Sequence, residues 1–327
     1  MKIIIDLLST EEESLLYALF EEADLSSDVM TLQPLERYGE KAKKLFLVYF
    51  DLEKTTRPFV VKIAAESDMQ KELGGIKHIS LYVDDAKNTA DCCQADIGAL
   101  LYRHAGATTA DKVGSSKEFG EVAYDLTVPT DSLICCLNEV YSKMETAHRA
   151  AKPEEIDLLE EDKGYEWYLR NNRPSRIEAI LGELRKVHDT FEFLGAQIYN
   201  PLYAIREVHK KRTCKVGPVH GDLHPKNIIL DGNYQKVGLI DFAWSAYPRH
   251  TLVDYTLLEN SLRFMLFPGF CSLPEQLEVD KLLLSETGYS DAAELTFSTD
   301  ESKQYFLMLT SMLRIIPQRA RAILDKH

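Results

Sequence analysis

The stretch from Val219 to Phe242, VHGDLHPKNIILDGNYQKVGLIDF, sets polar residues at the edges of two short apolar runs. Asp222 lies before the first run, and Asn227 comes five residues after Asp222. Asp241 ends the second run. The turn signal Asp231-Gly232-Asn233 between the runs predicts a β-hairpin, which would bring Asn227 and Asp241 close together. One carboxylate and one carboxamide oxygen suit Mg²⁺ when phosphates supply its other ligands, and Asp222 is then left to accept a proton from a hydroxyl.

Two linked motifs resemble the aminoglycoside-phosphotransferase-like branch of the protein-kinase-like fold: His220-Gly-Asp222-Leu-His224-Pro-Lys-Asn227 and Leu239-Ile-Asp241-Phe242. The step from Asp to Asn matches the kinase catalytic loop, in which the Asp is the base and the Asn binds metal. The resemblance therefore implies Asp222 as the catalytic base and Asn227 and Asp241 as ligands of Mg²⁺. It also implies ATP or GTP as the co-substrate.

Three residues near these motifs are interpreted as structural. His220 and His224 flank the predicted base, and we see no third ligand that would make them a zinc site. Asp254 follows Asp241 by thirteen residues and resembles the Asp that supports the catalytic loop in small-molecule kinases. So short a spacing leaves no room for a long activation segment, which favours a small-molecule kinase over a protein kinase.

Lys62 lies inside an otherwise apolar predicted strand, residues 59–63. It resembles the strand lysine that contacts the nucleotide phosphates in this fold. Glu72 comes ten residues later on a predicted helix and is the candidate for its paired acid, with Glu66 as the alternative. Taken alone, the lysine would be read as a surface residue of an edge strand, but the downstream motifs favour a nucleotide site.

Residues Leu101, Tyr102 and Arg103 end another predicted strand and resemble the hinge whose backbone holds an adenine ring. An ordinary core strand accounts for these side chains equally well, because hinge recognition uses backbone groups.

The chain departs from the family pattern at two places. Residues 34–44 contain one glycine where eukaryotic-type kinases have several, although aminoglycoside-type kinases often lack that motif. Asp241 is followed by Phe-Ala-Trp, so a flexible glycine switch is absent from this position of the sequence.

A closer resemblance covers residues 250–264, with Trp244 and Arg249 before them. This segment looks most like the ternary-complex-associated domains, which are bacterial kinase-like proteins of predicted signalling or conflict systems.

The predicted fold class is α+β, a bilobal protein-kinase-like fold. Residues 1–104 form a small β-rich N-lobe, and residues 105–327 form a larger, mainly helical C-lobe with an embedded catalytic hairpin. A capping box at Ser9 opens the first helix of the N-lobe. Long helices of the C-lobe are expected at residues 131–149, 163–171, 176–194 and 201–210.

Composition limits the class of partner. The net charge of −14 argues against nucleic acid, which requires a basic footprint, and is compatible with a cationic substrate. The sequence contains no run of 18 or more apolar residues, so no membrane span is expected. The acidic start is unlike a secretory signal, and a cytoplasmic protein is predicted. The six cysteines lack zinc-ligand spacing and are expected to be buried, reduced thiols.

The predicted function is transfer of a γ-phosphoryl group from ATP or GTP to a hydroxyl of a small molecule. The acidic segment 153–162, with Tyr165, Trp167 and Tyr168 after it, would suit an amine-bearing substrate. A solvated helix face with its aromatics in the core is the favoured interpretation of that segment. Two alternatives stay open: a nucleotide-sensing pseudokinase scaffold, and a protein kinase that acts on a protein partner.

Overall fold

A computed structural model describes most of the chain. The described residues are 2–4, 8–25, 29–34, 42–49, 59–87, 89–103, 116–158, 163, 165, 182–183, 186, 189–193, 196–200, 211–265, 268–283 and 295–324. The lobe boundary expected at residue 104 falls at the edge of an undescribed stretch. Most of the glycine-poor loop and the helix predicted at 201–210 also lie outside the described residues.

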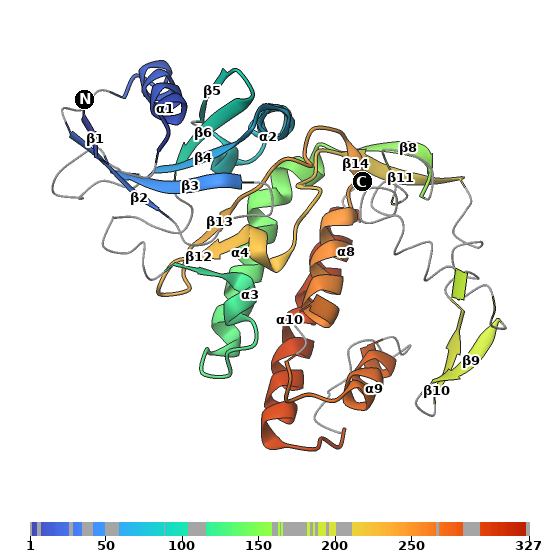
Figure 1. The fold of residues 1–327 in the computed structure, drawn as a ribbon. Coiled ribbons are helices and arrows are strands. Elements are labelled where there is room, and N and C mark those ends of the chain that lie inside the picture. Colours follow the sequence, from blue (N-terminus) through green and yellow to red (C-terminus); the bar gives the residue numbers. More distant parts are fainter. Residues whose placement is uncertain are drawn as a thin grey trace.

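A six-stranded sheet forms the N-terminal part of the molecule, in the strand order β1-β2-β3-β4-β6-β5 (Figure 1). The strands are β1 (Lys2–Ile4), β2 (Val29–Pro34), β3 (Ala42–Tyr49), β4 (Phe59–Ala65), β5 (Ala90–Gln94) and β6 (Ile97–Arg103). β1 runs parallel to β2, and the other neighbouring strands are antiparallel. The hairpin of β3 and β4 confirms the predicted strand pair that carries Lys62.

Helix α1 (Thr10–Glu22) covers one face of this sheet (Figure 1). It begins with the predicted capping box, in which the Ser9 hydroxyl accepts from the Glu12 amide and the Glu12 carboxylate accepts from the Ser9 amide. Its apolar side packs on buried strand residues of that face, such as Val61 and Leu101. Since side chains alternate along a strand, the neighbouring residues Lys62 and Tyr102 belong to the opposite face.

The C-terminal part is mainly helical. Its helices are α3 (Phe119–Val122), α4 (Thr130–Arg149), α8 (Val253–Asn260), α9 (Leu273–Leu283) and α10 (Asp300–Leu324), with a π-helical turn, η4, at Ser261–Met265. α4 and α10 run beside each other through the middle of this part (Figure 1). Buried residues of both helices, for example Leu137 and Leu309, belong to one hydrophobic core, which confirms the α+β class.

Three small sheets are added to this helical framework. The predicted hairpin is present as β12 (Ile228–Leu230) and β13 (Val237–Leu239), with β7 (Lys117–Glu118) on the outer side of β12. The other strands are β8 (Lys152–Asp157), β11 (Lys211–Gly217) and β14 (Arg249–His250) in one sheet, and β9 (Thr190–Phe193) and β10 (Ala196–Tyr199) in the other.

The structure corrects two of the helix predictions. The acidic segment from residue 153 begins as strand β8 rather than as a helix, because it pairs with the basic strand β11 and sets Lys211 opposite Asp157. The helix predicted at 176–194 does not reach residue 194, because Thr190–Phe193 pairs with β10 as a hairpin. The rest of that helix, and of the one predicted at 163–171, lies largely outside the described residues.

The structure also corrects, in part, the expectation that all six cysteines are buried, reduced thiols. All six are free thiols, but only Cys136 and Cys271 are buried, and Cys135 is exposed.

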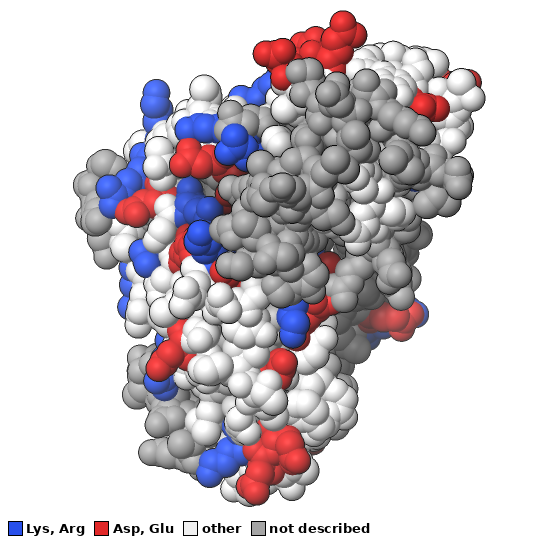
Figure 2. Space-filling view, turned by 90° about the vertical axis from the view of Figure 1, so that its left-hand side faces the viewer, with Lys and Arg blue, Asp and Glu red and all other residues white. Residues whose placement is uncertain are grey.

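Among the described residues, no helix has the length and apolar character that crossing a membrane would require. On the face drawn in Figure 2, acidic and basic side chains are interspersed.

Candidate active site

The predicted base, Asp222, lies in a loop that a buried carboxylate holds in place. Asp254, at the start of α8, is fully buried and accepts the amide N–H groups of His220 and Gly221, each at 2.9 Å. Burial by itself would raise the pKa of Asp254, but its contacts with His148 and with the Gly221 amide outweigh burial and lower it. The carboxylate therefore stays ionised and fixes the backbone immediately before Asp222.

His148, near the C-terminal end of α4, is a site residue that the sequence analysis missed. It is fully buried, with Nε2 at 2.9 Å from Asp254 Oδ2 and Nδ1 at 3.1 Å from the Tyr255 hydroxyl. A histidine at the end of a long helix carries no local signal of this role. Only the packing of α4 against α8 brings the two residues together.

The two histidines of the motif lie beside the base in different environments. His220 is buried, and its Nε2 donates to the Ile240 carbonyl at 2.9 Å. Burial lowers the pKa of His220 despite the nearby Asp254. His224 Nε2 lies 3.7 Å from Asp222 Oδ2, while burial, followed by the neighbouring His220, lowers the pKa of His224 to about 4. Both rings are consequently neutral at pH 7, so His224 does not form an ion pair with Asp222.

The hairpin places the two predicted metal ligands at one end. Asn227 closes the short 3-10 helix η3 (Pro225–Asn227), and its carbonyl accepts the Ile240 amide N–H at 3.1 Å. Asp241 is the next residue and has a φ of +60°, in the left-handed region that few side chains adopt. Such backbone strain persists where the surroundings enforce it, and it often marks functional sites.

This donor set fits Mg²⁺ together with a nucleotide. Asn227 Nδ2 donates to the Asp222 carbonyl at 2.9 Å, so the amide end is engaged and the carboxamide oxygen is left to act as a ligand. A carboxamide oxygen and the Asp241 carboxylate are hard donors of the kind Mg²⁺ prefers. Within the described residues, no group of three or more His, Cys, Asp and Glu side chains could hold a metal ion. Phosphate oxygens and water, which Mg²⁺ usually retains, would complete the coordination.

Lys62 of β4 forms an ion pair with Glu72 of α2 (Glu66–Ile79), with 2.6 Å between Nζ and Oε2. Of the two candidate acids, Glu72 is thus the one in contact, while Glu66 begins the helix. Burial would lower the pKa of Lys62, but the charges of Glu72 and then of Asp241 outweigh it and raise that pKa. The ammonium group is therefore charged, and the Asp241 carboxylate lies within electrostatic range of it.

The predicted hinge residues divide between the two faces of the sheet. Tyr102 lies on the Lys62 face and packs against a small apolar cluster that includes Leu47 and Val60. Burial, with the charges of Glu72 and Asp241, raises the pKa of Tyr102. Tyr102 therefore borders the same charged centre as Lys62.

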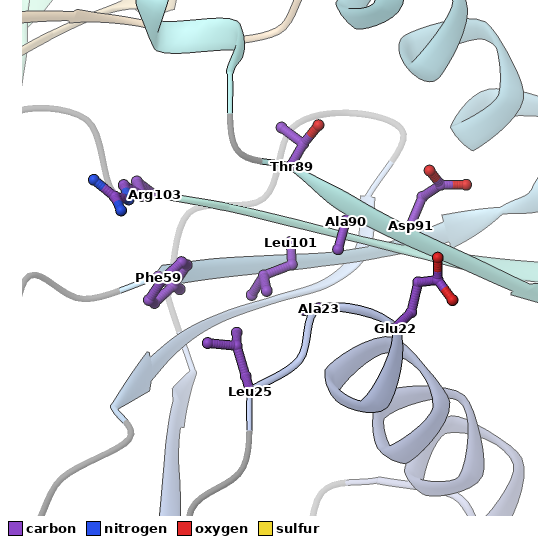
Figure 3. A pocket seen from close by; sticks show the side chains of 9 residues that line it. All are labelled: Glu22, Ala23, Leu25, Phe59, Thr89, Ala90, Asp91, Leu101 and Arg103. Atoms are coloured by element: carbon purple, nitrogen blue, oxygen red, sulfur yellow. The ribbon is translucent and has the colours of Figure 1, made fainter.

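The side chains of Leu101 and Arg103 face the other way. They line a cavity of about 400 Å³ beside the C-terminal end of α1, together with Phe59 and Glu22 (Figure 3). This cavity lies across the sheet from Lys62, so it is separate from the charged centre. The role predicted for Leu101 and Arg103 concerned backbone groups, and it stays a prediction.

Comparison with known proteins gives one match to a family model. The family model described as ternary complex associated domain 9 matches residues 168–325, slightly less than half of the chain. No curated protein matches the chain in sequence. The predicted resemblance to the ternary-complex-associated domains is confirmed by this family match.

Solved structures similar to this chain include small-molecule kinases of the protein-kinase-like fold. One is an aminoglycoside phosphotransferase from Streptomyces rimosus with ADP and streptomycin, at 15% identity and a TM-score of 0.36, covering 94% of this chain and 99% of that one. Another is a choline kinase from Cryptosporidium parvum, at 12% identity and a TM-score of 0.41, covering 96% and 95%. A Plasmodium vivax ethanolamine kinase has 13% identity and a TM-score of 0.41, covering 98% and 90%.

Proposed function

We propose that the protein transfers the γ-phosphoryl group of ATP or GTP to a hydroxyl of a small molecule. The observation that carries this proposal is the meeting of two groups far apart in the sequence. Phe242, the residue after Asp241 at the end of the hairpin, contacts Gly75 of α2, one turn after the Glu72 that pairs with Lys62. The charge of Asp241 also contributes to the raised pKa of Lys62. A charged lysine, a carboxylate and the carboxamide of Asn227 around one centre suit a nucleotide polyphosphate with its cation.

Each residue takes one role in this proposal. Lys62, held by Glu72, orients the α- and β-phosphates. The backbone of residues 101–103 holds the nucleotide base, and Asp222 orients the acceptor hydroxyl. As the oxygen–phosphorus bond to the acceptor forms, Asp222 takes the hydroxyl proton. The bond between the γ-phosphorus and the β–γ bridging oxygen breaks, and the nucleoside diphosphate leaves.

Asn227 and Asp241 would hold Mg²⁺, which neutralises charge on the transferred group when it is bound. Phosphoryl transfer has a loose transition state, so positioning and charge stabilisation dominate its catalysis. The arrangement of residues 1–104 as a nucleotide-covering lobe, and of residues 105–327 as a substrate-binding lobe, belongs to the same proposal.

The experiment that tests the proposal is titration calorimetry of Mg²⁺-ATP, and then of Mg²⁺-GTP, into the wild-type protein and two variants. Asp241→Asn removes the charge but keeps a residue that tolerates left-handed backbone, whereas alanine there would add strain. Asp84→Asn is the control, because the Asp84 side chain is 88% exposed and pairs only with the nearby Lys87 among its described contacts.

Metal-dependent binding in the wild type and in Asp84→Asn, with loss in Asp241→Asn, would support the proposal and justify a screen of hydroxyl acceptors. If neither nucleotide binds the wild type, the kinase proposal is wrong and a scaffold function takes its place.

A further inference from the structure

One face of helix α2 rests on the turn that follows Asp241. A Cβ atom built on Gly75 would lie 1.7 Å from the Phe242 carbonyl oxygen, so only a hydrogen atom fits there. The neighbouring Gly74 is different, since its Cβ would meet only the Ala246 side chain, at an ordinary 3.8 Å. The close approach of the helix is therefore specific to Gly75.

Two more side chains on the same face reach the turn. His78 Nδ1 lies 2.6 Å from the Ser245 carbonyl and must donate to it, because a carbonyl oxygen only accepts. The Lys71 ammonium lies 4.1 Å from the centroid of the Trp244 ring. Positions 71, 75 and 78 share one helical face, so the contacts form a continuous line along α2.

The opposite side of the turn is also in close contact, with the loop that carries Asp222. Gly221 has a φ of +81°, and a Cβ there would lie 2.5 Å from the Trp244 carbonyl oxygen. The Ser245 hydroxyl donates to the His220 carbonyl at 2.9 Å. The turn is thus clamped between Gly75 of α2 and Gly221 of the loop that carries Asp222.

Glu72 is on the same helix, one turn before Gly75, and faces Lys62. A tilt of α2 away from the turn that leaves β4 in place would draw Glu72 away from Lys62. We propose that Gly75 and His78 are positioning residues, which lock α2 onto the turn after Asp241 and so keep the Lys62–Glu72 pair assembled without a regulatory signal. This inference rests on the proposed function, because it concerns the nucleotide site of that proposal.

The test compares Gly75→Ala with Gly74→Ala, and His78→Ala with His78→Asn. Asparagine can place an N–H donor near the position of histidine Nδ1, so His78→Asn should rescue the contact. Calorimetry gives the affinity for Mg²⁺-ATP, and acrylamide quenching of Trp244 fluorescence reports on the turn without any nucleotide. The quenching is measured in a Trp167→Phe background, which leaves Trp244 as the single tryptophan.

We expect Gly75→Ala and His78→Ala to lose roughly tenfold to a hundredfold in nucleotide affinity, the range for loss of one charge-assisted contact, here that of Lys62 with the nucleotide phosphates. Both should also make Trp244 more accessible to quencher, while Gly74→Ala and His78→Asn resemble the wild type. A double-mutant cycle of His78→Ala with Glu72→Gln separates positioning of Glu72 from general damage to the fold. If His78 acts through Glu72, the double variant binds Mg²⁺-ATP no more weakly than the weaker-binding single variant.

Two outcomes overturn the proposal: affinity and quenching unchanged in folded His78→Ala, or fully additive losses with Glu72→Gln. If the wild type binds no nucleotide, the proposed function fails on its own. Quenching then still decides whether Gly75 and His78 hold the turn.

Discussion

Asp254 accepts hydrogen bonds from three buried donors, namely the amides of His220 and Gly221 and the ring of His148. Asp254→Ala would leave these donors without an acceptor, and each unsatisfied group costs about 1–3 kcal/mol. We expect the free energy of unfolding to fall by at least about 3 kcal/mol, measured by urea denaturation. Asp84→Ala, at an exposed position, should change it by less than about 0.5 kcal/mol. Equal effects of the two substitutions would contradict this role of Asp254.

Asp222 should affect the rate of transfer and not the binding of nucleotide. Removal of a general base costs roughly 10²–10⁴-fold in rate. With an acceptor identified, Asp222→Asn should lower kcat by that range, while calorimetry shows Mg²⁺-ATP affinity close to that of the wild type. Full transfer activity in Asp222→Asn would exclude Asp222 as the base.

Glu275, near the start of α9, gives the chain a specific acid sensitivity. Burial would raise its pKa, but donors from Ser298 and Ser272 outweigh burial and lower it to about 2. A lowered pKa contributes stability above the ordinary value of 4.5, and this stability is lost as the pH falls toward 2.

The wild type should therefore be more stable than Glu275→Gln at neutral pH, and the difference should shrink below about pH 4.5. Urea denaturation over a pH series measures this. Glu278→Gln on the same helix is the control, because its partner Lys281 is exposed and the pair is worth little. A difference between wild type and Glu275→Gln that is independent of pH would contradict the assignment.

Among the elements, α1 depends on its cap. The Ser9 hydroxyl accepts the Glu12 amide at 3.2 Å, and the helix covers the outer face of the sheet. Ser9→Ala should cost about 0.5–2 kcal/mol in the free energy of unfolding. Ser14→Ala, at an exposed position inside the helix, should be neutral or slightly stabilising, because alanine is the better helix former. Chemical denaturation of the two variants provides the comparison, and equal losses would argue against the cap.

Helix α2 can be predicted from the sequence, but the contact that requires a glycine in it cannot. Its apolar spacing predicts a helix, and the Gly74-Gly75 pair makes the end of that helix uncertain in the sequence. The structure continues the helix to Ile79. Glycine costs helix stability because its backbone is so free, but at position 75 no larger residue fits against the Phe242 carbonyl. That contact joins residues far apart in the sequence, so no local pattern indicates it.

For the whole molecule, a nucleotide site that draws on both β4 and the hairpin should couple binding to global stability. Mg²⁺-ATP at a hundred times its Kd would stabilise the folded state by about 2.7 kcal/mol. The Tm should therefore rise by several degrees, measured by differential scanning calorimetry, and EDTA should remove most of the rise. Asp241→Asn should show no rise. An equal shift with and without EDTA would contradict a metal-dependent site.

The sequence by itself determined the features whose information is local. The turn signal at residues 231–233 between two apolar runs predicted the hairpin, and the Ser9 capping box and the apolar strand around Lys62 were found where expected. These features depend on residues a few positions apart, where backbone preferences and side-chain periodicity act directly.

Only the tertiary structure decided which distant residues meet. It selected Glu72 over Glu66 for Lys62, placed His148 against Asp254, and brought Gly75 onto the turn after Asp241. It also turned the acidic segment into strand β8, because a basic partner strand lies beside it. Such contacts result from the packing of whole elements around a shared core, and their energies depend on burial that no short stretch of sequence contains.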